Sequence, residues 1–428
     1  MKSSPSENTP TSAEMPSVEQ CFRQHVNAGY ARLAALMNLP VEQSSQGVYI
    51  DDDQGRRYLD VGGYGVFFLG HGHPTVVAAV IRQLQRNALA SKVLLNPEQA
   101  FAAQALAAVC PGDLQYVFFC NSGTEATEAA LKLARVNGCR RVLSTEGGFH
   151  GKTLGALAVT GRESYRAPFD GLIGQHAFVP YGEVHALEQA LAQDPERACV
   201  ILEPVQAEAG VIVPPPGYLA EVRRLCDRHG ALLIFDEIQS GLGRTGRWWA
   251  CDHEQVVPDI MLVGKSLSGG CVPVAAMVAT PTVYAPFNRN PTLHTSTFGA
   301  NPLAMAAVRA TLQVMQQENL VERAHVLGQH LQTRLLDLLE RVGLDDRVQL
   351  RGSGLLLGFE FEEASMAADM VMALLEQRII VCHSLNDHRV IRLTPSPLLS
   401  AEDCHWLVEG FGRALTACVP ARRTLESL

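Results

Sequence analysis

Short apolar segments alternate with longer amphipathic stretches between about residue 115 and residue 280. In chain order, the apolar runs are QYVFFC, RVLS, HAFVP, ACVILEP, ALLIFDE, IMLVGK and VAAMVAT. Runs of this kind, separated by helical stretches, are typical of parallel strands that helices bury on both faces. The pattern therefore predicts an α/β fold. In an open sheet of this type, ligands bind at the carboxyl ends of the strands.

The two ends of the chain predict a second, smaller domain. A length of 428 residues exceeds the size, about 250–300 residues, at which a single core stops growing. Long helical periodicity begins near residue 303, and short strands follow it. We expect residues 16–85 and 303–428 to form the small domain, residues 86–302 to form the large one, and residues 1–15 to be a disordered tail.

Composition argues against several classes of protein. A net charge of −9 without a basic stripe disfavours nucleic acid as a partner, because phosphate binding needs clustered Lys and Arg. No apolar run approaches the roughly 18 residues of a membrane span, and the N-terminus lacks a signal-peptide core. The 11 cysteines are scattered singly, and His71 and His73 have no evident third ligand. We expect a cytoplasmic protein with reduced thiols, no metal and a small-molecule ligand.

The lysines single out one candidate for chemistry. The chain has five, at positions 2, 92, 132, 152 and 265, and the first three fall in the tail or on predicted polar surfaces. Lys265 follows the apolar run IMLVG and precedes SLSGG, which places an amine at the carboxyl end of a buried strand. Burial lowers the pKa of a lysine, as a Schiff-base nucleophile requires. The alternative is a strand-terminal lysine that reaches out to water.

Asp236 ends another buried run, in ALLIFDEIQSG. A buried carboxylate is costly unless a cation or a hydrogen-bond donor pairs with it. A pyridinium nitrogen would be such a partner, and Gln239, about one helical turn further on, could bond a ring oxygen. A structural salt bridge of Asp236 is an equally good interpretation of the aspartate alone.

A predicted helix start lies in FFCNSGTEATEAALKLARVNG. Ser122 and Glu125 form a capping-box pattern at its beginning, and Asn137-Gly138 supplies a stop at its end. The backbone N–H groups of Gly123 and Thr124 would then point outward at the positive end of the helix, where phosphate groups bind. The position of this turn directly after a buried strand favours a phosphate site.

The segment GLGRTG, with Gly241, Gly243 and Gly246, matches the spacing of a dinucleotide fingerprint. A fingerprint of that type needs its glycines at the tight turn between a strand and a helix. Here DEIQS intervenes, and RWWACDHEQVVPD after it has no clear helical period. We interpret the segment as a glycine-rich loop, and a nicotinamide dehydrogenase is the less favoured alternative.

Several motifs, in this order and spacing, resemble the class III aminotransferases of fold type I, which depend on pyridoxal phosphate (PLP). They are NSGTE, FHG, EPVQAEAGV, FDEIQSGLGRTG, GK and TSTFGANPL, within about residues 45 to 415. The resemblance implies a mostly parallel seven-stranded sheet flanked by helices, with a smaller α+β domain from both chain ends. Within the class, LHTSTFGANPLA, FHGKTLGALAVTG and SLNDHRVIRLTP look most like putrescine (diamine) aminotransferases, and ornithine and acetylornithine aminotransferases come next.

The resemblance also implies roles for single residues. Lys265 would carry the cofactor as a Schiff base and shuttle the substrate proton, and Asp236 would pair with the ring nitrogen. The remaining cofactor contacts would come from Gln239 at the phenolic oxygen, Phe149 on the ring face, Ser122, Gly123 and Thr124 at the phosphate, and Thr297 of a neighbouring subunit. A residue supplied across an interface would make the homodimer the functional unit.

Glu208 and Arg392 match the family's switch pair. Arg392 would bind the α-carboxylate of glutamate or 2-oxoglutarate, and Glu208 would neutralise it when the other substrate brings no carboxylate there. Tyr64 matches a position that lines the substrate channel in relatives. Lys152 stands where many ornithine-type relatives have Arg, which favours a partner without a distal carboxylate.

The resulting hypothesis is a transaminase that moves a terminal amino group between an ω-amine, such as a diamine, and 2-oxoglutarate. One alternative is an ornithine or acetylornithine aminotransferase. Another is an aminomutase, racemase or decarboxylase on the same fold, and the presence of both Glu208 and Arg392 argues against it. A non-enzymatic binding protein is disfavoured because Lys265 and Asp236 are both present.

Overall fold

The computed structural model describes residues 16–172, 174, 176–193 and 196–418. The tail expected over residues 1–15 lies outside this range. The chain divides into two compact units: the first comprises the described residues up to Ser45 with Ile50–Arg57, and the second comprises Gln46–Tyr49 with Tyr58 onward. The domain limits expected from the sequence stay a prediction.

The first unit is small and holds three short helical segments and most of two strands. A capping box joins Ser17 and Gln20 at the first helix, and Asn27 caps the third through its side chain. Its elements are α1 (Val18–Cys21), the π-helix η1 (Phe22–Val26), α2 (Ala28–Leu36), β1 (Glu42–Gln46) and β2 (Tyr49–Asp52).

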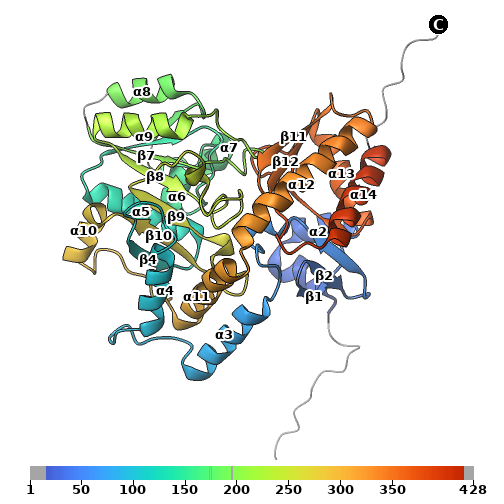
Figure 1. Cartoon of the computed structure of the whole chain (residues 1–428), viewed down its shortest axis with the longest axis horizontal. Helices are drawn as coiled ribbons and strands as arrows, with labels where there is room; N and C mark the ends of the chain where they lie inside the picture. Colours follow the sequence, from blue (N-terminus) through green and yellow to red (C-terminus); the bar gives the residue numbers. More distant parts are fainter. Residues whose placement is uncertain (1–15, 173, 175, 194–195, 419–428) are drawn as a thin grey trace, which may run out of the picture. The chain divides into compact units, whose positions relative to one another are not determined.

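The second unit contains a seven-stranded sheet in the order β4-β10-β9-β8-β7-β5-β6 (Figure 1). The strands from β5 to β9 pair in parallel, whereas β10 runs antiparallel to both of its neighbours. Each strand coincides with one of the seven apolar runs: β4 (Tyr116–Cys120), β5 (Arg141–Thr145), β6 (Ala177–Val179), β7 (Ala198–Leu202), β8 (Leu232–Asp236), β9 (Ile260–Val263) and β10 (Ala275–Ala279). The α/β fold with a mostly parallel seven-stranded sheet is therefore confirmed.

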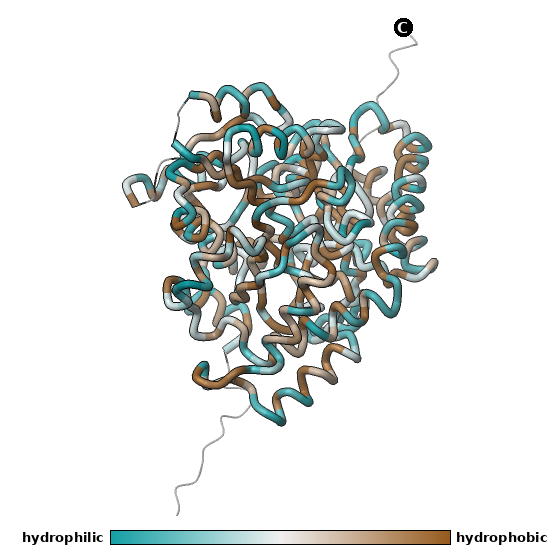
Figure 2. The backbone as a smooth tube through the Cα atoms, turned by 60° about the vertical axis from the view of Figure 1, so that its left-hand side comes forward, coloured by the Kyte–Doolittle hydropathy of each residue, from teal (hydrophilic) through white to brown (hydrophobic). Residues whose placement is uncertain are grey.

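The central strands are buried on both faces, which explains why their sequences are apolar throughout instead of alternating. Leu232 and Ile234 of β8 pack in one core cluster with α5 (Gly123–Val136), while Leu233 and Phe235 pack in another with α9 (Tyr218–His229). Successive side chains of a strand point to opposite faces, so helices must cover both sides. Figure 2 shows continuous brown, hydrophobic stretches of backbone, in contrast to helical coils that alternate between brown and teal.

Further helices of the second unit surround this sheet. Several begin with side-chain caps, such as Asn96 before α4, Thr280 before α10 and Asn301 before α11. Their bounds are α3 (Pro74–Arg86), α4 (Pro97–Ala107), α6 (Leu154–Ala158), α7 (Glu163–Arg166), α8 (Val184–Ala192), α10 (Pro281–Arg289) and α11 (Pro302–Gln317). Short 3-10 turns are η2 (Gly63–Gly65), η3 (Ala167–Phe169), η4 (Ala250–His253) and η5 (Lys265–Ser268).

A smaller sheet forms in the C-terminal part of the second unit, in the order β11-β12-β15-β14, beside α12, α13 and α14 (Figure 1). Its strands are antiparallel, and β13 pairs in parallel with β3. The bounds are β3 (Arg57–Asp60), α12 (Leu320–Arg341), β11 (Val348–Ser353), β12 (Leu356–Phe361), α13 (Ala364–Glu376), β13 (Ile379–Ile380), β14 (Cys382–His383), β15 (Val390–Leu393) and α14 (Ala401–Cys418). A smaller α+β part thus accompanies the large sheet.

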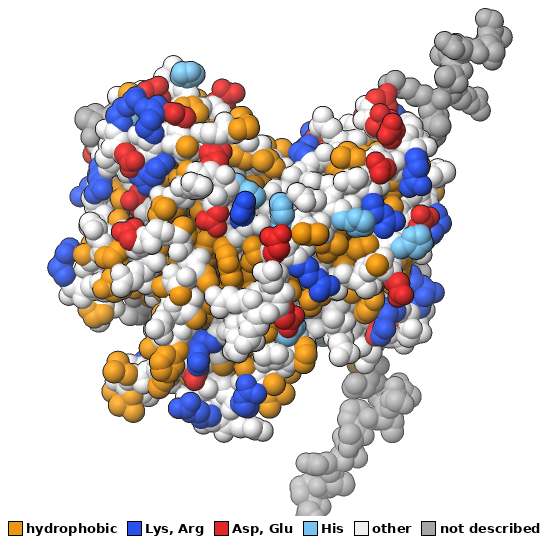
Figure 3. All heavy atoms as spheres, viewed as in Figure 1, with side chains coloured by type: hydrophobic (Ala, Val, Ile, Leu, Met, Phe, Trp, Pro, Cys, Tyr) orange, Lys and Arg blue, Asp and Glu red, His pale blue; other side chains and the backbone are white. Residues whose placement is uncertain are grey.

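Two observations concern the helices and the visible surface of the described residues. Within the described ranges, no helix combines the length and the apolar character that crossing a membrane requires. Figure 3 shows acidic and basic side chains interspersed over the visible face, without a large cluster of one sign.

Candidate functional site

A cavity of about 250 Å³ lies where β4, β7, β8 and β9 end. The carboxyl ends of parallel strands meet at one edge of a sheet, which is where an α/β fold places its ligand. The strand ends and the turns after them contribute most of the wall. The lining residues are Gly123, Thr124, Phe149, His150, Gly151, Glu203, Glu208, Asp236, Ile238, Gln239 and Lys265.

Lys265 lies directly after Gly264, which follows β9, and opens η5. Its backbone has φ +44°, a left-handed conformation that is uncommon for a residue with a side chain and occurs at functional turns. Burial lowers the pKa of Lys265, and the nearby charge of Glu208 partly opposes that shift. A lowered pKa favours the neutral amine, which is the form that attacks a carbonyl carbon.

Asp236, the last residue of β8, is buried and its carboxylate has two partners. Oδ2 lies 2.8 Å from Nδ1 of His150, and Oδ1 accepts the backbone N–H of Ile238 at 3.1 Å. Burial alone would lower the pKa of His150, but the hydrogen bond and charge of Asp236 raise it above its ordinary value. The two side chains therefore form a buried, hydrogen-bonded pair at the cavity.

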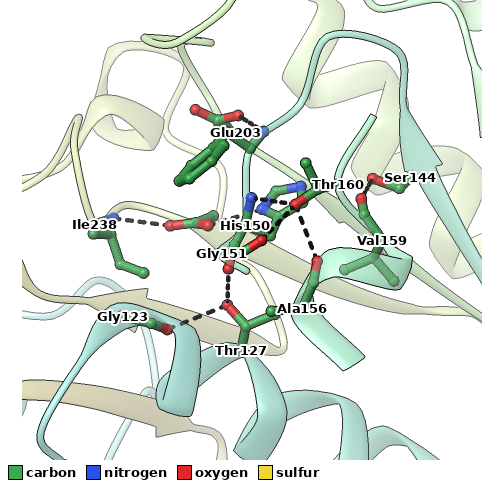
Figure 4. Close-up of polar contacts among 12 residues, drawn as sticks. Gly123, Thr127, Ser144, His150, Gly151, Ala156, Val159, Thr160, Glu203 and Ile238 are labelled. Atoms are coloured by element: carbon green, nitrogen blue, oxygen red, sulfur yellow. Dashed lines mark hydrogen bonds and ion pairs between the residues drawn. The ribbon is translucent and has the colours of Figure 1, made fainter. Parts of the chain in front are cut away.

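His150 was not singled out from the sequence, although it follows Phe149 in the FHG motif. Figure 4 shows how its backbone is fixed: Thr160 Oγ1 accepts the His150 N–H, and Thr127 Oγ1 donates to the His150 carbonyl. Thr127 also donates to the carbonyl of Gly123 at the start of α5. These bonds couple the FHG loop to the helix start, a relation between distant segments that spacing along the chain does not reveal.

Glu203, directly after β7, is a second cavity residue that the sequence did not single out. It is 4% exposed, and burial raises its pKa to about 7. Oε1 of Glu203 accepts the backbone N–H of Phe149 at 2.7 Å (Figure 4). Glu203 thereby fixes the loop that brings Phe149 to the cavity. The available signal was a carboxylate at the end of a buried strand, the same signal that identified Asp236.

The start of α5 has one half of the predicted capping box, the bond from the Glu125 N–H to Ser122, whereas the Glu125 carboxylate bonds to the N–H of Asn121 instead of that of Ser122. Ser122 is the N-cap, and its Oγ accepts the backbone N–H of Glu125 at 3.4 Å. The Glu125 carboxylate bonds back to the Asn121 N–H at 2.7 Å and to the Ser122 hydroxyl at 3.1 Å. Gly123 and Thr124 are the first helical residues and line the cavity, so their N–H groups lie at the positive end of the helix dipole.

Gln239 reaches the cavity from the turn after β8, and both polar atoms of its side chain are buried without a hydrogen-bond partner among the described residues. The amide packs against Gly65, where a Cβ would lie only 2.2 Å from the Gln239 Nε2 atom. Gly65 also has φ +74°, which favours glycine. Buried unpaired amide atoms are costly, so this arrangement fits a ligand that supplies the missing bond.

Arg392 of β15 is completely buried and forms an ion pair with Glu208, with 2.7 Å between Nη1 and Oε1. Burial by itself would raise the pKa of Glu208, but the charges of Arg392 and Lys265 hold it below its ordinary value. Nε and Nη2 of Arg392 have no hydrogen-bond partner among the described residues. The pair thus joins the small sheet to the cavity. Nε and Nη2 of Arg392 remain able to donate further hydrogen bonds.

Four residues expected at the site do not line this cavity: Ser122, Arg392, Tyr64 and Thr297. Ser122 is the N-cap just before the lining residue Gly123, and Arg392 pairs with the lining residue Glu208. Tyr64 is 61% exposed, with φ +48°, and Thr297 is exposed in the segment before α11. Lys152 is also exposed, with its Nζ 4.2 Å from the centre of the Tyr165 ring. The cavity in a single chain is therefore built without Tyr64 and Thr297.

The GLGRTG and HGH segments, considered above as a dinucleotide site and a metal site, have structural roles. GLGRTG forms consecutive turns followed by η4, not the strand-to-helix junction of a dinucleotide site, and its Arg244 is buried and donates to the Pro395 carbonyl. His71 of the HGH segment bonds to Asp60 at 2.8 Å. Within the described ranges no group of His, Cys, Asp and Glu could hold a metal ion.

The residues around the cavity fit pyridoxal phosphate. A lysine amine, a buried carboxylate, an unpaired amide and a helix N-terminus match the four polar features of that molecule: its aldehyde, ring nitrogen, phenolic oxygen and phosphate. Phe149 adds an apolar surface to the same wall. The fit rests on chemically different groups that four separate strands bring together.

Comparison with known proteins agrees with this site. Residues 30–415 match the family model for class-III aminotransferases. An ornithine aminotransferase from Toxoplasma gondii, with partial occupancy of PLP at its active site, is 33% identical over 93% of each chain, with a TM-score of 0.85. An adenosylmethionine-8-amino-7-oxononanoate aminotransferase from Methanocaldococcus jannaschii is 26% identical over 94% of this chain and 99% of its own, with a TM-score of 0.86.

An omega transaminase from Pseudomonas jessenii in complex with PMP shares the fold, with a TM-score of 0.86 at 24% identity over 94% of this chain and 98% of its own. The family match covers most of the chain, and the fold and the cavity chemistry agree with it. The chain thus belongs to the class-III aminotransferases and is a PLP-dependent transaminase that takes an amine donor and a keto acid acceptor.

Proposed function

We propose that this transaminase moves a terminal amino group between an ω-amine, such as a diamine, and 2-oxoglutarate. The observation that carries the proposal is the buried Glu208–Arg392 ion pair at the cavity wall. Arg392 can bind the carboxylate next to the keto group of 2-oxoglutarate through two parallel N–H bonds. Glu208 neutralises the same arginine when the substrate brings no carboxylate there. A shuttle between two unlike substrates needs this exchange.

In this proposal, different residues of the cavity transfer the substrate proton and stabilise the charge on the cofactor ring. When bound, PLP withdraws electrons from the substrate carbon that bears nitrogen, which makes the proton on that carbon acidic. Lys265 Nζ takes that proton and returns it on the cofactor side. Asp236 keeps the ring nitrogen protonated, and the neighbouring His150 stabilises the Asp236 charge.

The other contacts hold the cofactor in place. Ser122, Gly123 and Thr124 bind the phosphate at the start of α5, and Gln239 bonds the phenolic oxygen. Phe149 lies against the ring, in a position that Glu203 fixes through the Phe149 N–H. Tyr64, exposed in η2, borders the entry path of the amine.

A direct test adds candidate amines to the purified protein and follows its visible absorption. Putrescine, cadaverine, ornithine, N-acetylornithine, 4-aminobutyrate and glutamate form the panel. We expect a diamine and glutamate each to convert the cofactor to its aminated form, and 2-oxoglutarate to reverse it. Ornithine is the second candidate donor, favoured by the likeness to the T. gondii ornithine aminotransferase. Conversion by ornithine but not by diamines would replace the first proposal with the second.

Replacing Arg392 with alanine should weaken the reaction with 2-oxoglutarate far more than the reaction with a diamine. Truncating one partner of a buried charge pair costs roughly 2–5 kcal/mol, so we expect kcat/KM for 2-oxoglutarate to fall roughly a hundredfold or more. The change for the diamine should be smaller, because a diamine brings no carboxylate to Arg392. Glu208→Gln is the matched variant and should show the opposite preference. Equal losses for both substrates in R392A would remove Arg392 from carboxylate recognition.

The functional unit in this proposal is a homodimer in which Thr297 binds the phosphate of the neighbouring subunit. Support comes from its exposure outside its own cavity and from exposed apolar residues nearby in the chain, such as Leu293 and Phe298. Leu94 and Leu95, 77% and 100% exposed, lie between α3 and α4. In Figure 3, hydrophobic side chains gather over that segment, at the lower left. An exposed apolar patch of this kind is typical of a protein interface.

Replacing Thr297 with alanine should weaken PLP binding by roughly tenfold, because one hydrogen bond to a charged group is lost. Titration of the cofactor-free protein with PLP measures this, and Thr292→Ala in the same exposed segment is the control. A mixed dimer of K265A and T297A subunits tests the direction of donation. If Thr297 acts across the interface, the site with the intact Lys265 binds PLP as tightly as in the wild type; a roughly tenfold weaker PLP affinity at that site would place Thr297 in its own subunit's site.

A further inference from the structure

Glu208 is held from a second side, independently of Arg392. Its Oε2 accepts the backbone N–H of Leu385 at 2.9 Å, while Oε1 faces Arg392. Its main-chain carbonyl accepts the N–H of Asn386 at 2.8 Å. The N–H groups of two consecutive residues, Leu385 and Asn386, therefore donate hydrogen bonds to the side chain and to the backbone of Glu208.

The loop formed by Ser384, Leu385 and Asn386, here called the 384–386 loop, is itself firmly anchored. Asn386, 9% exposed, donates from Nδ2 to the carbonyl of Gly147 at 2.7 Å. Ser384 donates to the Ala207 carbonyl at 3.2 Å. On its outer side, Tyr165 donates to the Leu385 carbonyl at 2.9 Å. The cavity-side anchors lie in the turns that follow β5 and β7, at residues 147 and 207–208.

We propose that Asn386 is a positioning residue that fixes the Leu385 N–H against Glu208 and thereby favours the amine half-reaction over the keto acid half-reaction. This inference rests on the exchange proposed above for Glu208 and Arg392. When an amine without a carboxylate is bound, Glu208 must stay paired with Arg392, and the Leu385 N–H holds it there. When a keto acid binds, its carboxylate takes Arg392 and Glu208 must release it, so the same bond gives no advantage.

The charge balance supports a role for this bond. Glu208 is almost fully buried, and the Leu385 N–H is one of the groups that lower its pKa against the effect of burial. A buried carboxylate that loses a backbone donor is stabilised less. The Arg392 charge is then neutralised less well in the amine half-reaction, and a bound α-carboxylate compensates for that loss in the other.

Asn386→Ala tests the proposal in single-turnover measurements of the two half-reactions. We expect kcat/KM for the amine to fall roughly tenfold, equivalent to about 1.4 kcal/mol, while kcat/KM for 2-oxoglutarate changes by less than about threefold. Asn386→Asp is the second variant, because it keeps the shape and loses the donor to Gly147. Asp387→Asn is the matched control, since Asp387 directly follows the 384–386 loop and its side chain accepts hydrogen bonds from Arg389.

A binding measurement separates positioning from damage to the cavity. Glutarate, which has the carboxylates of 2-oxoglutarate but cannot react, should bind N386A holoenzyme as tightly as wild type or more tightly, as measured by calorimetry. Equal losses in both half-reactions, or no change in either, would overturn the proposal. If the wild-type enzyme rejects 2-oxoglutarate, the proposed function fails first; an unaltered preference in N386A and N386D with an active wild type refutes only the role of Asn386.

Discussion

Lys265→Ala should abolish turnover and remove the visible absorption band that the bound cofactor gives the wild-type protein. Lys265 lines the cavity, and burial lowers its pKa, so the proposed function assigns it both the nucleophilic amine and the proton transfer. We expect the rate to fall by at least roughly 10⁴-fold, the upper end of what a single proton-transfer group contributes. The rate with any accepted amine and the absorption spectrum measure this effect.

Lys152→Ala is the matched control for the lysine assignment. Lys152 lies three residues after Phe149 but is exposed, and its Nζ packs over the Tyr165 ring. The variant should keep the visible band, because its amine does not line the cavity. A K265A protein that retained the band and the activity, or a K152A protein that lost the band, would transfer the role to the other lysine.

Asp236→Asn should have the second-largest effect. The substitution keeps the side-chain shape but removes the negative charge that His150 Nδ1 contacts at 2.8 Å. Loss of one preorganised electrostatic group in an active site lowers kcat by roughly 10²–10³-fold. Because Asp236 raises the pKa of His150, the histidine should also become neutral at a lower pH in this variant. Rapid kinetics of the amine half-reaction and NMR titration of the imidazole measure the two effects.

Glu237→Gln is the control that separates catalysis from stability. Glu237 is the next residue and is also buried, but its carboxylate bonds to Ser240 and to the Cys251 N–H and does not line the cavity. We expect E237Q to lower the thermal unfolding temperature, since a glutamine amide keeps only one acceptor oxygen for the two bonds that hold the turn after β8. Its effect on kcat should stay within a few-fold. Equal kinetic losses in D236N and E237Q would show that only the local structure matters.

Much of the fold followed from local sequence patterns. The seven apolar runs became the seven strands of the sheet because strands that helices cover on both faces must be apolar throughout. The cap at Ser122 and the stop at Asn137-Gly138 bound α5 as expected, since both are local hydrogen-bond and backbone effects. The same strand-end rule brought Lys265 and Asp236 to one cavity.

Other parts of the site could not be read from the chain. His150, Glu203 and Asn386 act through partners 86, 54 and 239 positions away, namely Asp236, Phe149 and Gly147. Such contacts depend on which loops the sheet order brings side by side, and no local pattern encodes that order. The exposed positions of Tyr64 and Thr297 outside the cavity are likewise a result of loop geometry.

The sequence by itself determined the strands, the helix start and the family, because burial periodicity, capping and motif spacing are properties of neighbouring residues. The tertiary structure alone decided the buried pairs: Asp236 with His150, and Glu208 with Arg392 and with the backbone N–H of Leu385. Each side chain would be costly to bury alone, so both members must reach the same dry site together. Which residues pair with each other is therefore a property of the assembled cavity and not of any single segment of the chain.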